Sequence, residues 1–239
     1  MRTERKADEL RPLSIEPAVA KFAAGSARIA LGDTIVLCTA SLSDGVPGWL
    51  RGSGRGWLTA EYSMLPGATP TRTAREAVRG RQSGRTMEIQ RLIGRSLRGV
   101  VDLGIVGERT IAVDCDVLQA DGGTRTASIT GAYVAVHQVA LKIKDLIGLN
   151  EVPLFDSLSA VSVGVVDGRT LLDLDYEEDS AAAVDMNVVM TGDRRLVEVQ
   201  ATAEGEPYAR ETLDEMLGLA AAGAATLAAA QAAAVEALG

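Results

Sequence analysis

Apolar and polar residues alternate along several short stretches of the chain, and tight turns separate these stretches in pairs. Alternation with a period of two is typical of a strand that buries one face. A short turn that contains glycine joins two such strands into a hairpin. The pattern therefore predicts three hairpins, with strands at residues 27–31 and 34–38, at 161–165 and 170–174, and at 185–191 and 196–200.

One further strand leads into a glycine turn and then into a helix. Apolar residues occupy every second position from Ile111 to Val117, and Asp121-Gly122-Gly123 interrupts this alternation. An Ala/Ile/Val-rich stretch follows at once and predicts a helix over residues 126–147. Residues 57–63 predict one more strand.

The remaining helices are predicted from apolar residues that recur every three or four positions. Residues 86–103 carry such a stripe, and the end of the chain predicts two helices at 207–220 and 222–238. Residues 68–84 predict an exposed loop with a short helical stretch at 75–79. Strands paired as hairpins, packed with helices and without a linker rich in proline or serine, indicate one α+β domain over residues 1–239.

Composition excludes several classes of protein. Apolar residues make up 47% of the chain, but we find no apolar run of the roughly 18 residues that span a bilayer. The charged N-terminus does not resemble a signal peptide, and Cys38 and Cys115 lie in apolar strands, so we expect buried, reduced thiols in a cytoplasmic protein. His137 is the one histidine, and with two separated cysteines it argues against a zinc site.

Charge is distributed unevenly along the chain. The net charge is −8, yet residues 72–98 hold eight arginines and two acids, so this window carries +6 and the remainder −14. A local positive surface of this kind steers anionic ligands, and within it we expect Arg79, Arg91 and Arg98 to contact RNA. The helical arginines also fit a solvated basic face or ion pairs between subunits.

The glycine turn before residue 124 offers a phosphate-sized site. Free backbone N–H groups at a helix start, a hydroxyl and a guanidinium come together at Gly123, Thr124 and Arg125. An ordinary strand-to-helix turn with a solvated arginine is the alternative.

Two carboxylates stand apart within an acidic run. Asp185 opens a strand, and Asp179 is predicted in the turn just before it. The two could share a divalent cation, or one could act as a general base. An anion site, an arginine surface and a carboxylate pair fit one reaction, in which phosphate attacks an RNA phosphodiester and Mg²⁺ offsets the developing charge.

Long strings of the sequence carry a resemblance to a known family. They include R-P-L-S-I at Arg11, G-W-L-T-A-E-Y-S-M-L-P at Gly56, S-G-R-T-M-E-I-Q-R-L-I-G-R at Ser83, D-C-D-V-L-Q-A-D-G-G-T-R-T-A-S-I-T-G-A at Asp114 and D-M-N-V-V-M-T at Asp185. On these strings the chain resembles the bacterial ribonuclease PH family over nearly its whole length. The fold that this resemblance implies is a ribonuclease PH-like domain, similar to domain 2 of ribosomal protein S5.

The resemblance implies a phosphate-dependent 3′→5′ exoribonuclease that trims the 3′ ends of tRNA precursors and releases nucleoside diphosphates. It also implies Mg²⁺, phosphate as co-substrate, and a homo-hexamer built as a trimer of dimers, with no membrane partner. The implied phosphate site is Arg85, Gly123, Thr124 and Arg125. Asp179 and Asp185 match the catalytic and metal-binding aspartates, and Arg72 and Arg75 match arginines that contact tRNA.

The sequence departs from the family pattern at two positions. Gly67 stands where a basic residue often follows Leu-Pro, and Ala201 replaces a glycine in Q-A-T-A-E-G. Ala201 would strain the backbone if its φ were positive. An inactive ring subunit that binds RNA is the alternative function, and a hydrolytic nuclease is disfavoured by the phosphate site.

Overall fold

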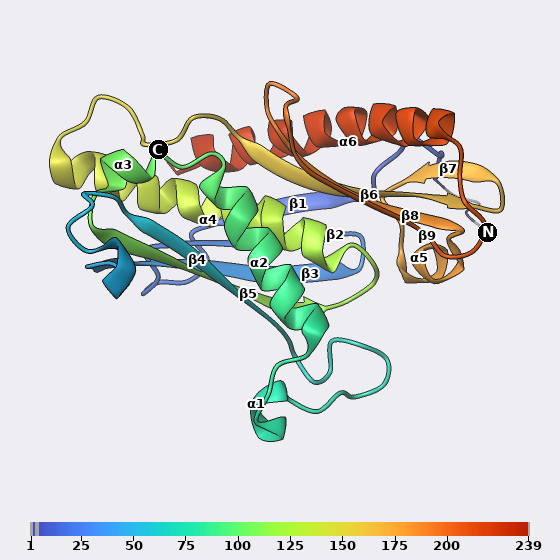
Figure 1. Cartoon of the computed structure of the whole chain (residues 1–239), viewed down its shortest axis with the longest axis horizontal. Helices are drawn as coiled ribbons and strands as arrows, with labels where there is room; N and C mark the ends of the chain where they lie inside the picture. The colour runs from blue at the N-terminus through green and yellow to red at the C-terminus, as the bar shows by residue number, and fades with distance from the viewer. Residues whose placement is uncertain (1, 3–4, 239) are drawn as a thin grey trace.

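Figure 1 presents a computed structural model of the chain, in which residues 2 and 5–238 are described. The strands are β1 Leu13–Pro17, β2 Gly25–Leu31, β3 Thr34–Asp44, β4 Trp57–Met64, β5 Arg109–Gln119, β6 Leu158–Val166, β7 Arg169–Leu172, β8 Val184–Thr191 and β9 Leu196–Ala203. The α-helices are α1 Glu76–Arg79, α2 Gly84–Arg98, α3 Leu103–Val106, α4 Thr124–Ile147, α5 Tyr176–Ala181 and α6 Arg210–Glu236. The expected mixture of strands and helices is confirmed.

The strands form two sheets. The first has the order β1-β2-β3-β5-β4, and the second has the order β7-β6-β8-β9. The three predicted hairpins, β2–β3, β6–β7 and β8–β9, are antiparallel neighbours as expected. Strand β5 belongs to none of these hairpins, since it lies antiparallel to β3 and parallel to β4. A parallel neighbour needs a crossover, and α1, α2 and α3 supply it.

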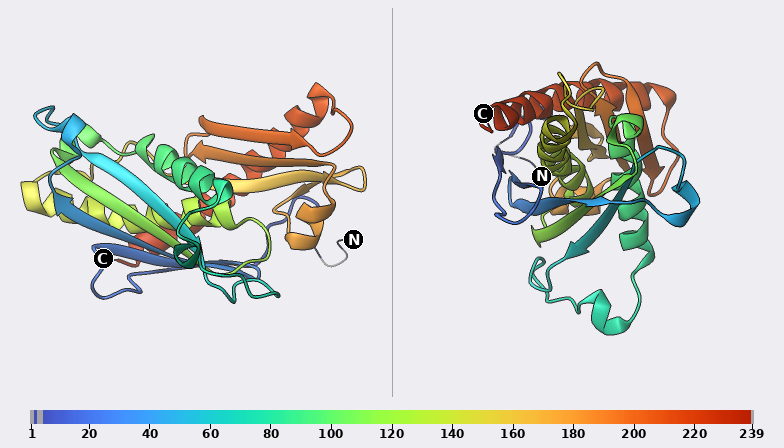
Figure 2. Two further views of the ribbon diagram at one scale, coloured as in Figure 1. Left: turned by 60° about the horizontal axis from the view of Figure 1, so that its bottom comes forward. Right: turned by 90° about the vertical axis from the view of Figure 1, so that its left-hand side faces the viewer.

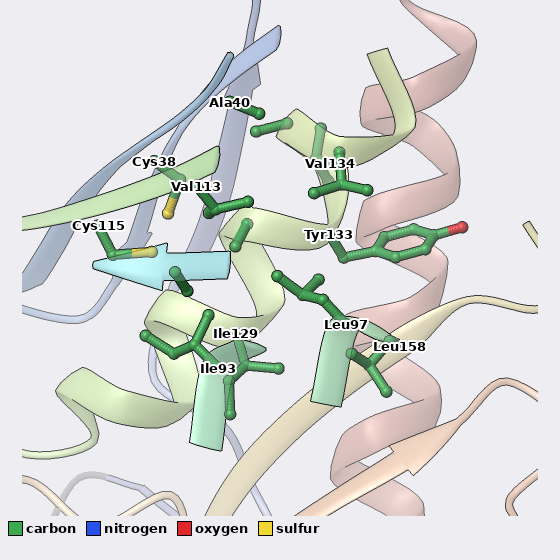
Figure 3. Close-up of a cluster of buried hydrophobic side chains, with 14 of the residues drawn as sticks. Cys38, Ala40, Ile93, Leu97, Val113, Cys115, Ile129, Tyr133, Val134 and Leu158 are labelled. Atoms are coloured by element: carbon green, nitrogen blue, oxygen red, sulfur yellow. The ribbon is translucent and has the colours of Figure 1, made fainter. Parts of the chain in front are cut away.

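Helices cover the sheets and join them. Helix α4 packs on β2, β3 and β5 and also contacts β6, while α6 packs on β6 and β7 (Figures 1 and 2). Figure 3 shows side chains from α2, α4 and the neighbouring strands converging in one apolar core. Cys38 and Cys115 lie opposite each other on β3 and β5 in this core, buried and not joined by a disulfide, as predicted.

The three largest differences between the predicted elements and the structure concern α2, α5 and α6. Helix α2 ends at Arg98, because Gly99 stops it and Val101 pairs with Leu154 in an isolated bridge. The acidic run forms α5, so Asp179 lies on a helix and not in a turn; Asp175 and Glu178 close a capping box at its start.

The C-terminal helix is the third difference. The two predicted helices are one continuous α6, since the alanine-rich sequence has the highest helix propensity across the predicted break at residue 221, and Gly223 packs closely against Leu172. By length and composition α6 is also the one helix among the described residues that could cross a membrane, which corrects our expectation of no such run. One of its faces is buried, at Met216, Ala220, Gly223, Ala224, Leu227, Gln231 and Ala234, as in a core helix.

Candidate active site

The glycine turn, residues 121–125, connects β5 to α4 and has a conformation that only glycine adopts easily. Gly122 and Gly123 have φ of 70° and 63°, in the left-handed region. A Cβ on Gly122 would lie 2.5 Å from the carbonyl oxygen of Leu174, so the turn lies directly against the segment that leads into α5. Thr34 Oγ1 donates to the Gly122 carbonyl at 2.6 Å and accepts from the Asp121 N–H at 3.0 Å.

The start of α4 has free donors. No side chain of the described residues caps this helix, whose N-cap residue is Gly123. The first-turn N–H groups therefore remain available, and the positive end of the helix favours an anion in front of them. The Thr124 hydroxyl hydrogen-bonds the buried Tyr62 hydroxyl at 2.9 Å, which fixes its position beside these N–H groups.

Arg125 lies beside this helix start and is held by two neighbours. Its Nη1 donates to Gln200 Oε1 at 2.9 Å and lies 3.5 Å from Glu88 Oε2. Glu88 and Arg85 are three residues apart on α2 and share one face of that helix. Arg85 is exposed, and its charge opposes the rise that burial causes in the pKa of Asp179.

The carboxylates of Asp179 and Asp185 lie near enough to Arg85 and Arg125 for these charges to affect their pKa values. Burial raises the pKa of Asp185 to about 6, and the charge of Asp179 adds to this rise while Arg125 opposes it. Asp179 is exposed as a residue, yet burial of its carboxyl still raises the pKa of that group against the opposing charges of Arg85 and Arg125. Helices α2 and α4 thus contribute the cations, and α5 and β8 contribute the carboxylates, of one site.

Asp185 fits a divalent cation. Its Oδ1 is buried and has no hydrogen-bond partner, and its Oδ2 accepts only a long 3.5 Å bond from Asn187. A cation would satisfy such an oxygen, and Mg²⁺ needs no more than one or two protein carboxylates. Across residues 2 and 5–238, no three His, Cys, Asp or Glu side chains form a metal-binding group.

A buried arginine ties the two halves of the site together. Arg11 donates to Asp173 through Nε at 3.0 Å and Nη2 at 2.7 Å, and its Nη1 donates to the Asp121 carbonyl. Asp173 is 1% exposed and precedes α5, whereas Asp121 belongs to the glycine turn. One guanidinium therefore fixes the glycine turn relative to the helix that carries Asp179.

The predicted RNA-contacting arginines differ in their surroundings. Arg72, Arg75 and Arg79 are exposed in residues 66–83, the arginine loop, which projects from the fold around α1 (Figure 1). Arg91 is exposed on α2. Arg98 instead lies 4.7 Å above the Trp57 ring and donates to the Leu58 carbonyl, so its guanidinium packs within the fold, and its contact with RNA stays a prediction.

Sequence reasoning missed several side chains of the site. Glu88 and Gln200 contact Arg125, and Glu204 raises the pKa of both aspartates. Arg11, Tyr62 and Glu88 lie in the strings that carry the family resemblance, and Gln200 and Glu204 lie in Q-A-T-A-E-G, the segment in which Ala201 departs from the family pattern. Ala201 lies in β9 and is not among the residues with positive φ, so the expected strain does not arise.

Two family models match the chain and define its class. Domain 1 of the 3′ exoribonuclease family matches residues 9–142, and domain 2 of the same family matches residues 156–223. The chain belongs to the 3′ exoribonuclease family. One domain over residues 1–239 remains a prediction.

Within this family, the chain is most usefully compared with three bacterial proteins named ribonuclease PH. The chain is 58% identical to ribonuclease PH of Moorella thermoacetica over 93% of this chain and 89% of that protein. It is 58% identical to ribonuclease PH of Methylocella silvestris over 98% of both chains, and 57% identical to that of Methylobacterium radiotolerans. The resemblance stated from the sequence strings is therefore confirmed.

Solved structures share the fold. Rice Rrp46 has a TM-score of 0.80 at 19% identity, with 98% of each chain covered, which bears on the fold alone. A chain of the Archaeoglobus fulgidus exosome, a structure with RNA bound to the active site, has a TM-score of 0.74 at 26% identity, with 93% of this chain and 88% of that chain covered.

Proposed function

We propose that this protein is a phosphate-dependent 3′→5′ exoribonuclease that trims the 3′ ends of tRNA precursors. The observation that carries the proposal is the convergence of Arg85 and Arg125, at an uncapped helix start, with Asp179 and Asp185. Anion-binding groups beside carboxylates are what an attack by phosphate on an RNA phosphodiester requires. The 57–58% identity to relatives named ribonuclease PH supports the same activity.

Phosphate binds at Gly123, Thr124 and Arg125, with Arg85 on its other side. One of its oxygens attacks the phosphorus that joins the last nucleotide to the RNA, and the bond from this phosphorus to the 3′ oxygen breaks. The 3′ oxygen takes a proton, which Asp185 or Asp179 supplies through its raised pKa. The last nucleotide leaves as a nucleoside 5′-diphosphate.

Asp179 and Asp185 would divide two roles between them, since the ionised carboxylate of the pair would hold Mg²⁺ while the other carries the proton. The ion, when bound, offsets the negative charge that develops on the transferred phosphoryl group. Asp185 contributes the buried, unpartnered Oδ1, and Asp179 on α5 lies near enough for its charge to add to the rise that burial causes in the pKa of Asp185.

RNA lies along the exposed arginines. Arg72, Arg75 and Arg79 in the arginine loop, with Arg91 on α2, contact the phosphate backbone. A cavity of about 760 Å³ between the loop and β4 is lined by Arg75, Arg79, Arg85 and Tyr62. It leads from the loop toward Thr124, because Tyr62 forms part of its wall and hydrogen-bonds Thr124. The terminal nucleotides enter the site through this cavity.

The proposal extends to assembly and location. Six copies form a ring as a trimer of dimers in the cytoplasm, as the ribonuclease PH resemblance implies. Within each copy the chain is one domain, since α4 contacts both sheets. No membrane partner is involved.

The reaction is tested with a 3′-extended tRNA and Mg²⁺, incubated with and without inorganic phosphate. We expect the RNA to shorten only when phosphate is present. Equal shortening without phosphate would indicate a hydrolytic nuclease, and RNA binding without shortening would indicate an inactive ring subunit.

A further inference from the structure

The Glu88 carboxylate lies 3.5 Å from the guanidinium of Arg125, which is one of the proposed phosphate ligands. We propose that Glu88 determines the phosphate affinity of the site by competing with phosphate for Arg125. The inference rests on the proposed function, because it assigns a role to a side chain beside the phosphate site.

The ion pair between Glu88 and Arg125 is partly shielded from water. The Arg125 side chain is 15% exposed and that of Glu88 is 32% exposed, with 3.5 Å between the carboxylate and the guanidinium. Charges interact more strongly in such surroundings than on an open surface. Because Arg85 lies on the same helix face one turn earlier, Glu88 is also adjacent to the second proposed phosphate ligand.

Glu88 is not needed to hold Arg125 in place. Gln200 accepts a 2.9 Å hydrogen bond from the same Arg125 Nη1, and this bond is independent of Glu88. The 3.5 Å separation from Glu88 exceeds that of a charge-assisted hydrogen bond, so the attraction is mainly coulombic. Removing the charge of Glu88 therefore leaves Arg125 positioned and frees its guanidinium for phosphate.

A competing carboxylate has a consequence for turnover. The diphosphate product keeps the attacking phosphate as its terminal group, so the contacts that bind phosphate also retain the product. If phosphate and the diphosphate product bind more tightly by the same amount, the Michaelis constant for phosphate falls and the maximal rate does not rise. Glu88 thus keeps phosphate binding weak and product release fast.

The test is Glu88→Gln, which removes the charge and keeps the shape of the side chain. We expect the Michaelis constant for phosphate to fall about three- to tenfold, as for other partly shielded charge pairs. We expect the maximal rate to stay level or fall, and a nucleoside diphosphate to inhibit more strongly. Rates are measured over a range of phosphate concentrations with saturating tRNA and fixed ionic strength.

Glu198→Gln is the matched control. Glu198, on β9, accepts a 2.7 Å hydrogen bond from Nε of Arg95, which lies on α2 beyond Glu88. Glu198→Gln therefore removes the same charge from a similar ion pair outside the site. Its Michaelis constant for phosphate should match that of the unsubstituted protein. A Glu88→Gln constant that is unchanged or higher would overturn the inference, and so would an equal fall in Glu198→Gln.

Phosphate binding without RNA separates this inference from the proposed function. Calorimetric titration with inorganic phosphate should give tighter binding to Glu88→Gln than to the unsubstituted protein. If the protein binds phosphate in this way but trims no tRNA, the proposed function fails and the role of Glu88 stands. If trimming depends on phosphate but the two affinities are equal, the role of Glu88 fails and the proposed function stands.

Discussion

The glycine turn and the arginine loop both offer positive charge to an anion, but the turn is fixed by buried contacts and the loop is exposed to solvent. The turn is fixed by Thr34 and Arg11, and a buried 24-residue helix follows it. The loop projects into solvent, its short helix α1 has no buried residue, and Val78 within it is 83% exposed. Chemistry needs atoms held in place, whereas capture of a long polyanion tolerates movement.

Arg125→Ala should have the largest effect on activity, because it removes a fixed cation from the proposed phosphate site. We expect the phosphate-dependent rate to fall about 10³-fold. Arg51→Ala, in the exposed loop before β4, is the control and should trim tRNA normally. If Arg125→Ala trims tRNA at low phosphate as fast as the unsubstituted protein does, Arg125 is not part of the phosphate site.

Asp185→Asn should lower the rate about 10²–10³-fold, as expected for a group that takes part in proton transfer. The loss should persist at every Mg²⁺ concentration. A rate close to that of the unsubstituted protein would exclude a catalytic role for Asp185.

Asp185→Asn should also stabilise the folded protein at neutral pH. The pKa of Asp185 in the folded state is about 6, above its usual value, so folding favours the protonated carboxyl. Stability is therefore lost as the pH rises from about 4 to about 6, and Asp185→Asn restores about 2–3 kcal/mol at most. Urea unfolding without divalent cations should reveal this gain at pH 7.5 and a smaller gain at pH 4.5. A gain that does not depend on pH would contradict the account.

Arg11→Met should make the glycine turn behave more like the arginine loop. It removes the side-chain hydrogen bonds that Arg11 donates to the buried Asp173, and because Arg5 remains 3.2 Å from that carboxylate we expect a cost of about 2–3 kcal/mol of unfolding free energy. Hydrogen exchange at Gly122 and Gly123 should become faster, while exchange in the arginine loop stays as it was. Arg28→Met breaks an exposed ion pair with Glu16 and should cost about 0–1 kcal/mol. Unchanged exchange at the turn would mean that Arg11 does not hold it.

Arg72→Ala combined with Arg75→Ala should have the smallest effect, confined to RNA binding. Each arginine that contacts a phosphate contributes about one to the slope of log affinity against log salt, so the slope should fall by about two. The Michaelis constant for phosphate should not change. An unchanged slope would assign these arginines to assembly.

The elements of the fold could be predicted where one short pattern decides them. The alternation of β5 and the turn at Gly32-Asp33 are local, and both agree with the structure. The parallel pairing of β4 with β5 depends on the three helices between them, which no local pattern contains. The continuous α6 was predicted as two helices divided at residue 221, whereas in the structure one helix runs through this position, and Gly223 within it packs closely against Leu172.

The site could be predicted for the residues that carry its charge, and less so for those that orient it. Arg125, Asp179 and Asp185 stand out by residue type and by family resemblance. Glu88 and Gln200 reach Arg125 from α2 and β9, far away in sequence. Arg11 joins parts of the chain 110 and 162 residues away, so its role follows only from the fold.

The fate of the attacking phosphate tests the central claim most directly. A 3′-extended tRNA is incubated with the protein, Mg²⁺ and phosphate labelled with ³²P, and the small products are separated. The account predicts label in the terminal phosphate of nucleoside diphosphates, and no such product from Arg125→Ala. Release of unlabelled nucleoside monophosphates would contradict it, because water and not phosphate would then be the nucleophile.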